Sequence, residues 1–441
     1  MADLRGDLTQ LLRIAVVTMT AATLGTVGGG VAQAAPGAAI PAAGVSEAFY
    51  QPPNPLPAGS PGDLIRTENF PVAITVPTVW GKVPARGTRL LYRSTDANGQ
   101  PVAVSGYYLE PTRAWPGPGP RPIIDYAGGL HGQGDSCAAS KMLQSGVEFL
   151  GPGGPRAEIE RLATYNMLAK GYGVVSSDYI GGGTPGTHTF AVRVDQANAV
   201  LDAGRAVLKL PQVASGTKIG IAGYSQGGAA AAAAAELATS YAPDLPLVGI
   251  YAGGAPTDLR ALLDHLDGGR LGGIIGYALN GVLARYPDVD TKVEPLLNAN
   301  GKATLKQIST ECIAATAIRF PKSSEWTVSG KTIGQIIDAT PDFQRVIDDQ
   351  DVGNGKPTVP TFLSGNPDDP TVPIAVSREL HRQWCAQNPA SLKYEEIPFP
   401  VRFIGGSPVG HVAGGVSGLT RALDWLKDRF AGTPAPTGCY G

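Results

Sequence analysis

The spacing of hydrophobic and polar residues changes along this chain and predicts regions of different architecture. From Ile65 to Glu110 apolar and polar residues alternate, and a turn at 96–99 interrupts them, so an antiparallel hairpin is expected. After a proline-rich loop at 115–122, short apolar segments typical of buried strands alternate with helical patterns. The predicted strands are 122–126, 173–177, 219–222 and 247–252, and the predicted helices are 157–170 and 192–209.

A region without predicted strands follows, from 257 to 350. Its helical segments lie at 259–266, 271–285 and 332–337, and we interpret it as a helical cap, or lid, inserted into the core. The core then resumes with a strand at 358–363 and helices at 375–387 and 417–430. The prediction is therefore an α/β fold whose mainly parallel sheet carries helices on both faces. Its core comprises residues 35–256, which begin with an irregular arm at 35–62, and residues 351–441.

The first 34 residues have the pattern of a signal peptide. Arg5 and Arg13 precede an apolar stretch at 14–24, and Ala32-Gln33-Ala34 is a small-x-small cleavage signal. The apolar stretch is too short for a permanent membrane helix, and no other segment is long and apolar enough for one. We expect an exported, secreted protein whose mature chain begins near Ala35.

Charge and cysteine content narrow the function classes. The 35 basic and 37 acidic residues give a net charge of −2 without a basic run, which argues against nucleic acid as a partner. An even cysteine count in an exported chain favours two disulfides over zinc, and no C-x-x-C pair indicates a metal site. Three pairings are possible, of which Cys385–Cys439 and Cys137–Cys312 are favoured. No cofactor is expected.

Residues 219–229 contain the sequence pattern of a nucleophile elbow. A short apolar strand runs into Gly223-Tyr224-Ser225-Gln226-Gly227, and an alanine-rich helix follows. In such an elbow the serine occupies a strained strand-to-helix turn that exposes its hydroxyl. The G-x-S-x-G spacing alone is weak, because 59 of the 441 residues are glycine. The strand before it and the helix after it favour Ser225 as a nucleophile.

A serine nucleophile needs a general base and an acid that orients the base, and in this class of fold they follow the serine in the order acid, then histidine. Of the five histidines, His411 alone lies in a glycine-rich loop before the last predicted helix, where a catalytic base is expected. The acid is expected in the turn after the strand at 358–363, which holds both Asp368 and Asp369. The D-x-x-V-P spacing favours Asp369.

The developing oxyanion requires main-chain N–H donors. One is expected from Gln226, directly after the nucleophile. The other is expected from the glycine-rich loop at 126–134, in which His131 is interpreted as structural.

With these residues in place, the chain resembles the secretory lipase family of fungi and actinobacteria, the lipase A type. The matching segments span most of the mature chain and include 49–53, 61–66, 131–132, 135–138, 177–181, 223–227, 253–259 and 422–432. The resemblance implies an α/β-hydrolase core, a helical lid, and hydrolysis of acylglycerol esters by a Ser225–Asp369–His411 triad. It also supports the Cys137–Cys312 pairing.

The resemblance places Gln226 on one oxyanion donor and Gln133 near the other. The segment before Asp135-Ser136-Cys137 looks one or two residues shorter than in the family, so Gly132, Gln133 and Gly134 all remain candidates.

Three functions stay open on the sequence. The leading one is a secreted lipase or carboxylesterase whose partner is a lipid or another ester, with a possible site of action at a lipid–water interface. A serine peptidase or acyltransferase could use the same triad, and a catalytically silent relative could act as a cell-envelope binding protein. Chain-length preference and oligomeric state are left open.

Overall fold

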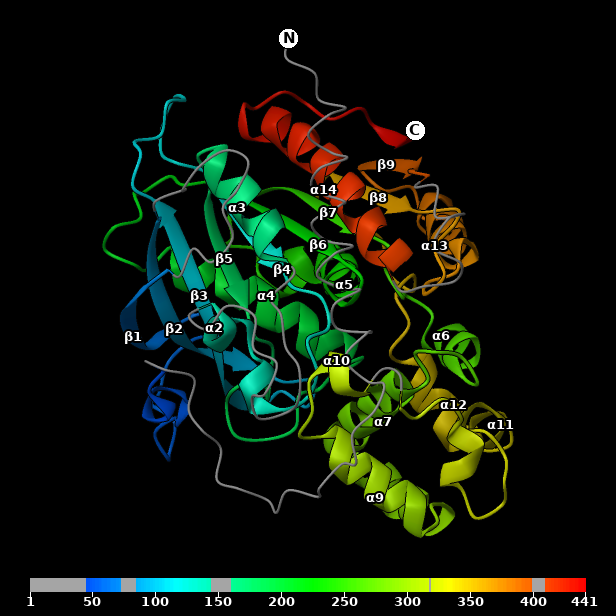
Figure 1. Ribbon diagram of the computed structural model, residues 1–441. Coiled ribbons are helices and arrows are strands. Elements are labelled where there is room, and N and C mark those ends of the chain that lie inside the picture. The colour runs from blue at the N-terminus through cyan, green and yellow to red at the C-terminus, as the bar shows by residue number, and fades with distance from the viewer. Residues whose placement is uncertain (1–44, 73–84, 144–159, 317–318, 399–408) are drawn as a thin grey trace, which may run out of the picture.

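The computed structural model describes residues 45–72, 85–143, 160–316, 319–398 and 409–441. They form one ten-stranded sheet with the order β1-β2-β3-β5-β4-β6-β7-β8-β9-β10 (Figure 1). β1, β2, β3 and β5 pair antiparallel, and every pairing from β5 to β10 is parallel. The strands are β1 Leu64–Pro71, β2 Ala85–Thr95, β3 Pro101–Pro111, β4 Ile123–Ala127, β5 Gly173–Ser177, β6 Ile219–Tyr224, β7 Leu247–Gly253, β8 Thr361–Gly365, β9 Ser391–Glu396 and β10 Gly438–Tyr440.

Helices cover both faces of the sheet. Successive side chains of each buried strand point to opposite sides, so both faces carry apolar residues that pack against helices. Ile123 belongs to the apolar cluster on the face packed by α4, α5 and α13, and the next residue, Ile124, belongs to the cluster packed by α3 and α14. This is the α/β-hydrolase architecture. The core helices are α2 Ala139–Met142, α3 Arg161–Ala169, α4 Arg193–Val207, α5 Gln226–Tyr241, α13 Ile374–Ala386 and α14 Val409–Phe430, with short 3-10 turns η1 Glu47–Tyr50 and η2 Asp135–Cys137.

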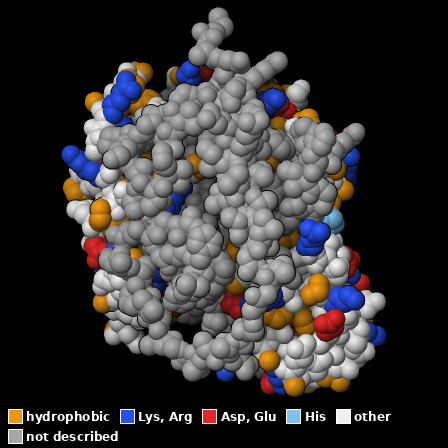
Figure 2. Space-filling view, in the orientation of Figure 1, with side chains coloured by type: hydrophobic (Ala, Val, Ile, Leu, Met, Phe, Trp, Pro, Cys, Tyr) orange, Lys and Arg blue, Asp and Glu red, His pale blue; other side chains and the backbone are white. Residues whose placement is uncertain are grey.

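A helical insertion separates β7 from β8 and lies at the lower right of Figure 1. Its helices bury an apolar cluster of their own, which includes Leu263, Tyr277 and Trp326. Its visible surface mixes apolar and charged side chains (Figure 2). That this insertion acts as a lid, with boundaries at 257 and 350, stays a prediction. The elements are α6 Leu259–Leu266, α7 Gly273–Arg285, α8 Pro287–Val293, η3 Glu294–Leu296, α9 Ala299–Ile308, α10 Ile313–Thr316, η4 Ser323–Trp326, α11 Ile333–Asp338 and α12 Pro341–Asp348.

Both favoured disulfides are present. Cys385–Cys439 joins α13 to β10, and Cys137–Cys312 joins the turn η2 to the helical insertion. The predicted signal peptide, 1–34, lies outside the described residues. None of the helices in the described part of the chain has the length and apolar character needed to cross a membrane.

Candidate active site

The serine of the predicted elbow sits in a strained turn between β6 and α5. Ser225 has φ 60° and ψ −124°, a left-handed conformation that side chains other than glycine rarely adopt. Its N–H donates to the carbonyl of Gly253 at 3.0 Å, which fixes the turn to the neighbouring strand β7. Such strain at a strand-to-helix turn is the local geometry of a nucleophile elbow.

Two glycines let the elbow fit. A Cβ on Gly223 would lie 2.0 Å from the carbonyl oxygen of Gly227, and one on Gly227 would lie 1.9 Å from that of Ala127. Because no side chain fits at such distances, the glycines of the G-x-S-x-G pattern are required by packing.

Asp369 and His411 form a buried hydrogen-bonded pair. His411 Nδ1 lies 2.7 Å from Asp369 Oδ2, and the two side chains are 10% and 1% exposed. Asp369 Oδ1 accepts the N–H groups of Thr371 and Val372 at 2.8 and 3.0 Å, which hold the carboxylate in one orientation. Burial acts to raise the pKa of Asp369, but these N–H groups and His411 outweigh it, so the pKa lies below its ordinary value.

The structure distinguishes the two candidate acids by position. Asp368 is exposed, and its N–H donates to the side chain of Asn366 as part of the turn after β8. Asp369 is the residue that reaches His411.

His411 also lies beside the elbow. Its ring centroid is 5.0 Å from that of Tyr224, the residue before Ser225, and the Tyr224 hydroxyl donates to Asp369 Oδ2 at 3.3 Å. His411 Nε2 is buried and has no hydrogen-bond partner among the described residues, so it does not contact the Ser225 hydroxyl in this state. Catalytic hydrogen bonds of this kind are often unformed before substrate binds.

The prediction that His411 lies in a loop is wrong. It falls in the first turn of α14, which starts at Val409 rather than near 417. Of the glycines that suggested a loop, Gly405 and Gly406 lie outside the described residues and Gly410 is part of the helix, while glycines further along α14 serve close packing. A Cβ on Gly414 would lie 2.8 Å from the Tyr224 hydroxyl, and one on Gly418 would lie 2.1 Å from that of Tyr251. The helix can therefore approach the carboxyl edge of the sheet and carry His411 to the elbow.

Gln226 is the first residue of α5, so its main-chain N–H has no acceptor within the helix. Its side-chain Nε2 lies 3.0 Å from Nε2 of the buried His188. Burial lowers the pKa of His188 to about 4, which keeps this imidazole neutral at ordinary pH.

The prediction that Gln133 supplies the second oxyanion donor conflicts with its contacts. Its main-chain N–H donates to the Glu311 carbonyl at 3.1 Å, and its side-chain Nε2 donates to the carbonyls of His188 and Tyr277. Gly134 also donates to Glu311, at 3.4 Å. This part of the loop therefore binds the helical insertion and has no N–H of Gln133 left for a substrate.

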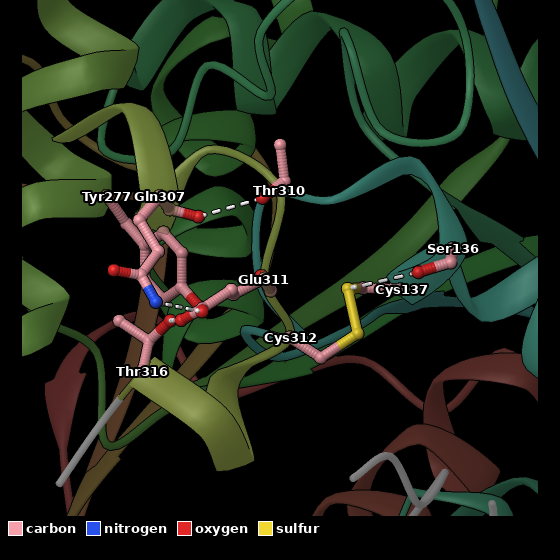
Figure 3. Close-up of a disulfide and its surroundings, with 8 residues drawn as sticks. All are labelled: Ser136, Cys137, Tyr277, Gln307, Thr310, Glu311, Cys312 and Thr316. Carbon is pink, nitrogen blue, oxygen red and sulfur yellow. Dashed lines mark hydrogen bonds between the residues drawn. A yellow bond between two sulfur atoms is a disulfide. The ribbon is translucent and has the colours of Figure 1, made fainter. Parts of the chain in front are cut away.

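Figure 3 shows the same junction around the Cys137–Cys312 disulfide. Glu311, the neighbour of Cys312, accepts the Tyr277 hydroxyl at its carbonyl and the Thr316 hydroxyl at its carboxylate. The loop after β4 and the insertion are thus joined by a covalent bond and by a network of hydrogen bonds.

Residues immediately after β4 lie beside the elbow. A Cβ on Gly227 would lie 2.9 Å from the Gly128 carbonyl, and one on Gly129 would lie 3.8 Å from the Tyr224 carbonyl. The Gly129 N–H donates to both carboxylate oxygens of Glu160, at 2.9 and 3.0 Å, and His131 Nε2 lies 3.7 Å from the same carboxylate. Glu160 carried no recognisable motif in the sequence, and only the fold brings it to this loop.

The comparisons with known proteins can be set against this geometry. The sequence profile of a family described as secretory lipase matches residues 154–438, more than half of the chain. The chain belongs to the secretory lipase family. As a member, it is a carboxylic ester hydrolase.

Similar proteins cover nearly the same length. Lipase 10 of Candida albicans is 27% identical over 414 residues, which are 89% of this chain and 82% of that protein. "Probable inactive lipase MT1628" of Mycobacterium tuberculosis is 27% identical over 401 residues, with 88% and 82% covered. The structure of Candida antarctica lipase A in its closed state has a TM-score of 0.74 at 24% identity and covers 91% and 89% of the two chains, which supports the fold.

This secretory lipase has one cavity beside the candidate active site and another inside the helical insertion. One is lined by residues that include Gly128, Gly129, His188 and Gln226. The other lies inside the insertion and is lined only by aliphatic and aromatic residues, among them Leu263 and Phe343. In the described residues, the one cluster with metal-ligand spacing is His381, Cys385 and Cys439, and its two sulfurs form a disulfide.

Proposed function

We propose that this secretory lipase hydrolyses esters through an acyl-enzyme on Ser225. His411 is the general base, and Asp369 orients it. The observation that carries the proposal is the buried Asp369–His411 hydrogen bond beside a serine held at φ 60°. Because Asp369 engages Nδ1, the unpartnered Nε2 is the atom left to take the serine proton.

The reaction proceeds in two halves. Nε2 of His411 takes the Ser225 proton while Oγ bonds to the ester carbonyl carbon, and the imidazolium then protonates the leaving alcohol as its C–O bond breaks. In the second half, His411 takes a proton from water as the water oxygen bonds to the acyl carbon. The imidazolium then returns a proton to Oγ as the acyl–Oγ bond breaks, which releases the carboxylic acid and restores Ser225. The lowered pKa of Asp369 keeps it ionised, so it stabilises the imidazolium in both halves.

The oxyanion donors follow from position. Gln226 supplies its main-chain N–H from the start of α5, and the second donor is Gly128 or Leu130, because the N–H groups of Gly129 and Gln133 already donate to Glu160 and Glu311. This assignment is supported by the cavity that Gly128, Gly129 and Gln226 line together. Donors of this kind are worth about 3 kcal/mol each in the transition state.

The substrates we propose are acylglycerols or related lipid esters. The apolar lining of the cavity in the insertion supports this proposal, because it offers no polar group that would need a partner beside an acyl chain. Export is also proposed, from the signal-peptide pattern at 1–34 and from two disulfides that suit an oxidising compartment.

The test is hydrolysis of p-nitrophenyl esters from acetate to palmitate by the mature protein and by Ser225→Ala. We expect activity that falls by at least about 10³-fold in the variant. Full activity of Ser225→Ala would refute the mechanism, and the chain-length profile would separate a lipase from a short-chain esterase.

A silent binding protein is the second candidate, because one relative bears the name "Probable inactive lipase MT1628". A fluorophosphonate probe separates the two. Labelling of Ser225 supports the enzyme, and an unlabelled, folded protein supports the silent alternative. Cleavage of amides by the labelled protein would instead favour a peptidase.

A further inference from the structure

The loop after β4 contains two adjacent glycines, Gly128 and Gly129, beside the proposed nucleophile. Because glycine has no Cβ, the peptide that joins them could rotate between several orientations at little steric cost. Either candidate donor, the N–H of Gly128 or that of Leu130, belongs to a peptide directly next to this one. The orientation of the Gly128–Gly129 peptide therefore affects where the candidate donor points.

Two side chains hold this peptide from opposite ends. The Tyr179 hydroxyl donates to the Gly128 carbonyl at 2.6 Å. The Gly129 N–H donates to both carboxylate oxygens of Glu160, at 2.9 and 3.0 Å. The carbonyl and the N–H of a trans peptide point in opposite directions, so rotation of this peptide would break both interactions. Tyr179 follows β5 and Glu160 precedes α3, so two separate segments of the core fix the loop.

Tyr179 is itself fixed as a hydrogen-bond donor. The residue is 4% exposed, and burial, together with the charge of Glu160, raises the pKa of its phenol well above the ordinary value, so the hydroxyl keeps its proton. Its backbone has φ 65°, a conformation that is uncommon for a bulky residue and that persists only where surrounding contacts impose it. One such contact is the hydroxyl of Ser177, which accepts the Tyr179 N–H at 2.9 Å.

The same tyrosine is connected to the other proposed donor. Its ring packs edge-on against His188, with 5.7 Å between the ring centroids. His188 Nε2 in turn accepts a hydrogen bond from Gln226 Nε2 at 3.0 Å, because an amide nitrogen can only donate. Tyr179, His188, Gln226 and the two glycines line one cavity, so the contacts of both proposed donors meet there.

We propose that Tyr179 and Glu160 are positioning residues, which hold the Gly128–Gly129 peptide so that an adjacent N–H points to the oxyanion. The proposal rests on the proposed ester hydrolysis at Ser225 and adds two residues that act through the loop. A misplaced donor weakens stabilisation of the transition state and leaves binding of the ground-state ester as it is. The loss should therefore appear in kcat and not in KM.

The experiment measures kcat and KM for p-nitrophenyl butyrate in Tyr179→Phe, which removes only the hydroxyl. One well-placed donor is worth about 10²–10³-fold in kcat, and Glu160 still holds the other end of the peptide, so we expect kcat to fall about tenfold with KM unchanged. Rates are expressed per Ser225 labelled by a fluorophosphonate, so unfolded protein does not count. The matched control is Tyr241→Phe, which removes a hydroxyl that donates to Asp202 at 2.6 Å at the other end of α5, and should leave both constants unchanged.

Two variants of Glu160 test the opposite end of the peptide, and they decide the matter if Tyr179→Phe does not fold. In Glu160→Gln the amide oxygen can still accept the Gly129 N–H, so most of kcat should remain. In Glu160→Ala the acceptor is lost, and kcat should fall about tenfold.

Three results would overturn the proposal. They are an unchanged kcat in folded Tyr179→Phe, a loss confined to KM, and a rise of kcat in Glu160→Ala, which would show that the carboxylate blocks a donor at Gly129. Failure of the proposed function reads differently, as retention of ester hydrolysis by Ser225→Ala.

Discussion

At the scale of single residues, the strongest constraint falls on Asp369. Its Oδ1 accepts hydrogen bonds from two main-chain N–H groups, and its Oδ2 accepts hydrogen bonds from His411 Nδ1 and the Tyr224 hydroxyl. The carboxylate is therefore fixed in orientation by its own turn, and it can fix the tautomer of His411 in return.

Replacing Asp369 with Asn should remove activity without unfolding the protein. The amide can still contact His411 but favours the wrong tautomer, so we expect kcat for a p-nitrophenyl ester to fall by about 10³–10⁴-fold. The matched control is Asp368→Asn, in the same turn but exposed and out of contact with His411. A larger loss in Asp368→Asn than in Asp369→Asn would contradict the assignment.

The predicted site residues differ in how far the neighbouring sequence determines their position in the structure. Ser225 and its glycines were predictable because strand, turn and helix are contiguous and the packing requirement is local. Gln133 was misplaced because the direction of a glycine-rich loop depends on its partner. Here that partner is Glu311, far away in the sequence.

At the scale of elements, apolar patterns gave most strands and helices to within a few residues. β5 and α6 were predicted at their observed bounds, whereas β8 begins three residues later than predicted, at Thr361 directly after Pro360. β9 and β10 were missed, because β10 has only three residues and most side chains of β9 are half-buried, so neither segment carries a strong apolar signal. The start of α14 was missed because the run Gly405-Gly406-Ser407-Pro408 directly before it is typical of a loop.

The base of the insertion contains a carboxyl group with a strongly shifted pKa. Burial raises the pKa of Asp351 to about 7, although its Oδ1 accepts the N–H of Leu259 at the start of α6. The nearby charges of Asp258 and Asp348 contribute to this raised pKa. A raised pKa means that the folded state holds a proton that the unfolded state releases.

The contribution of Asp351 to stability is therefore fully present below its unfolded pKa of about 4 and is lost as the pH rises through about 7. We expect Asp351→Asn to reduce the loss of unfolding free energy between pH 5 and pH 8, measured by urea titration. Asp290→Asn, on the exposed side of α8, is the control and should leave the pH dependence as it is. An identical pH dependence in Asp351→Asn and wild type would show that the carboxyl does not titrate in this range.

At the scale of the whole molecule, the core and the insertion are held together at separate places. Arg285 from α7 forms ion pairs with Asp96 and Asp195 of the core, and all three side chains are nearly buried. The Cys137–Cys312 disulfide makes a second, covalent connection at the loop after β4. The sequence predicted that the insertion is helical and favoured the Cys137–Cys312 disulfide, but it did not predict the long-range ion pairs of Arg285.

Removing the positive charge of Arg285 should destabilise the protein more than removing an exposed charge does. Arg285→Met leaves two buried carboxylates without their cation, and we expect the free energy of unfolding to fall by about 3–5 kcal/mol. Chemical denaturation at neutral pH measures this. Arg378→Met, which breaks an exposed pair with Glu396, should cost less than about 1 kcal/mol. Equal losses in the two variants would contradict the buried role of Arg285.

The two disulfides offer a way to separate stability from catalysis. By loop entropy, Cys137–Cys312 and Cys385–Cys439, with separations of 175 and 54 residues, should contribute about 5 and about 4 kcal/mol. Paired Cys→Ala replacements should therefore lower the melting temperature by similar amounts. Only the Cys137–Cys312 pair adjoins the loop that we propose to carry an oxyanion donor. Its removal should therefore also lower kcat measured at a temperature well below the melting temperature, whereas removal of Cys385–Cys439 should leave kcat unchanged. Equal kcat values for both double variants at 25 °C would show that the loop keeps its geometry without the covalent tie, through the bonds of Gln133 and Gly134 to Glu311 alone.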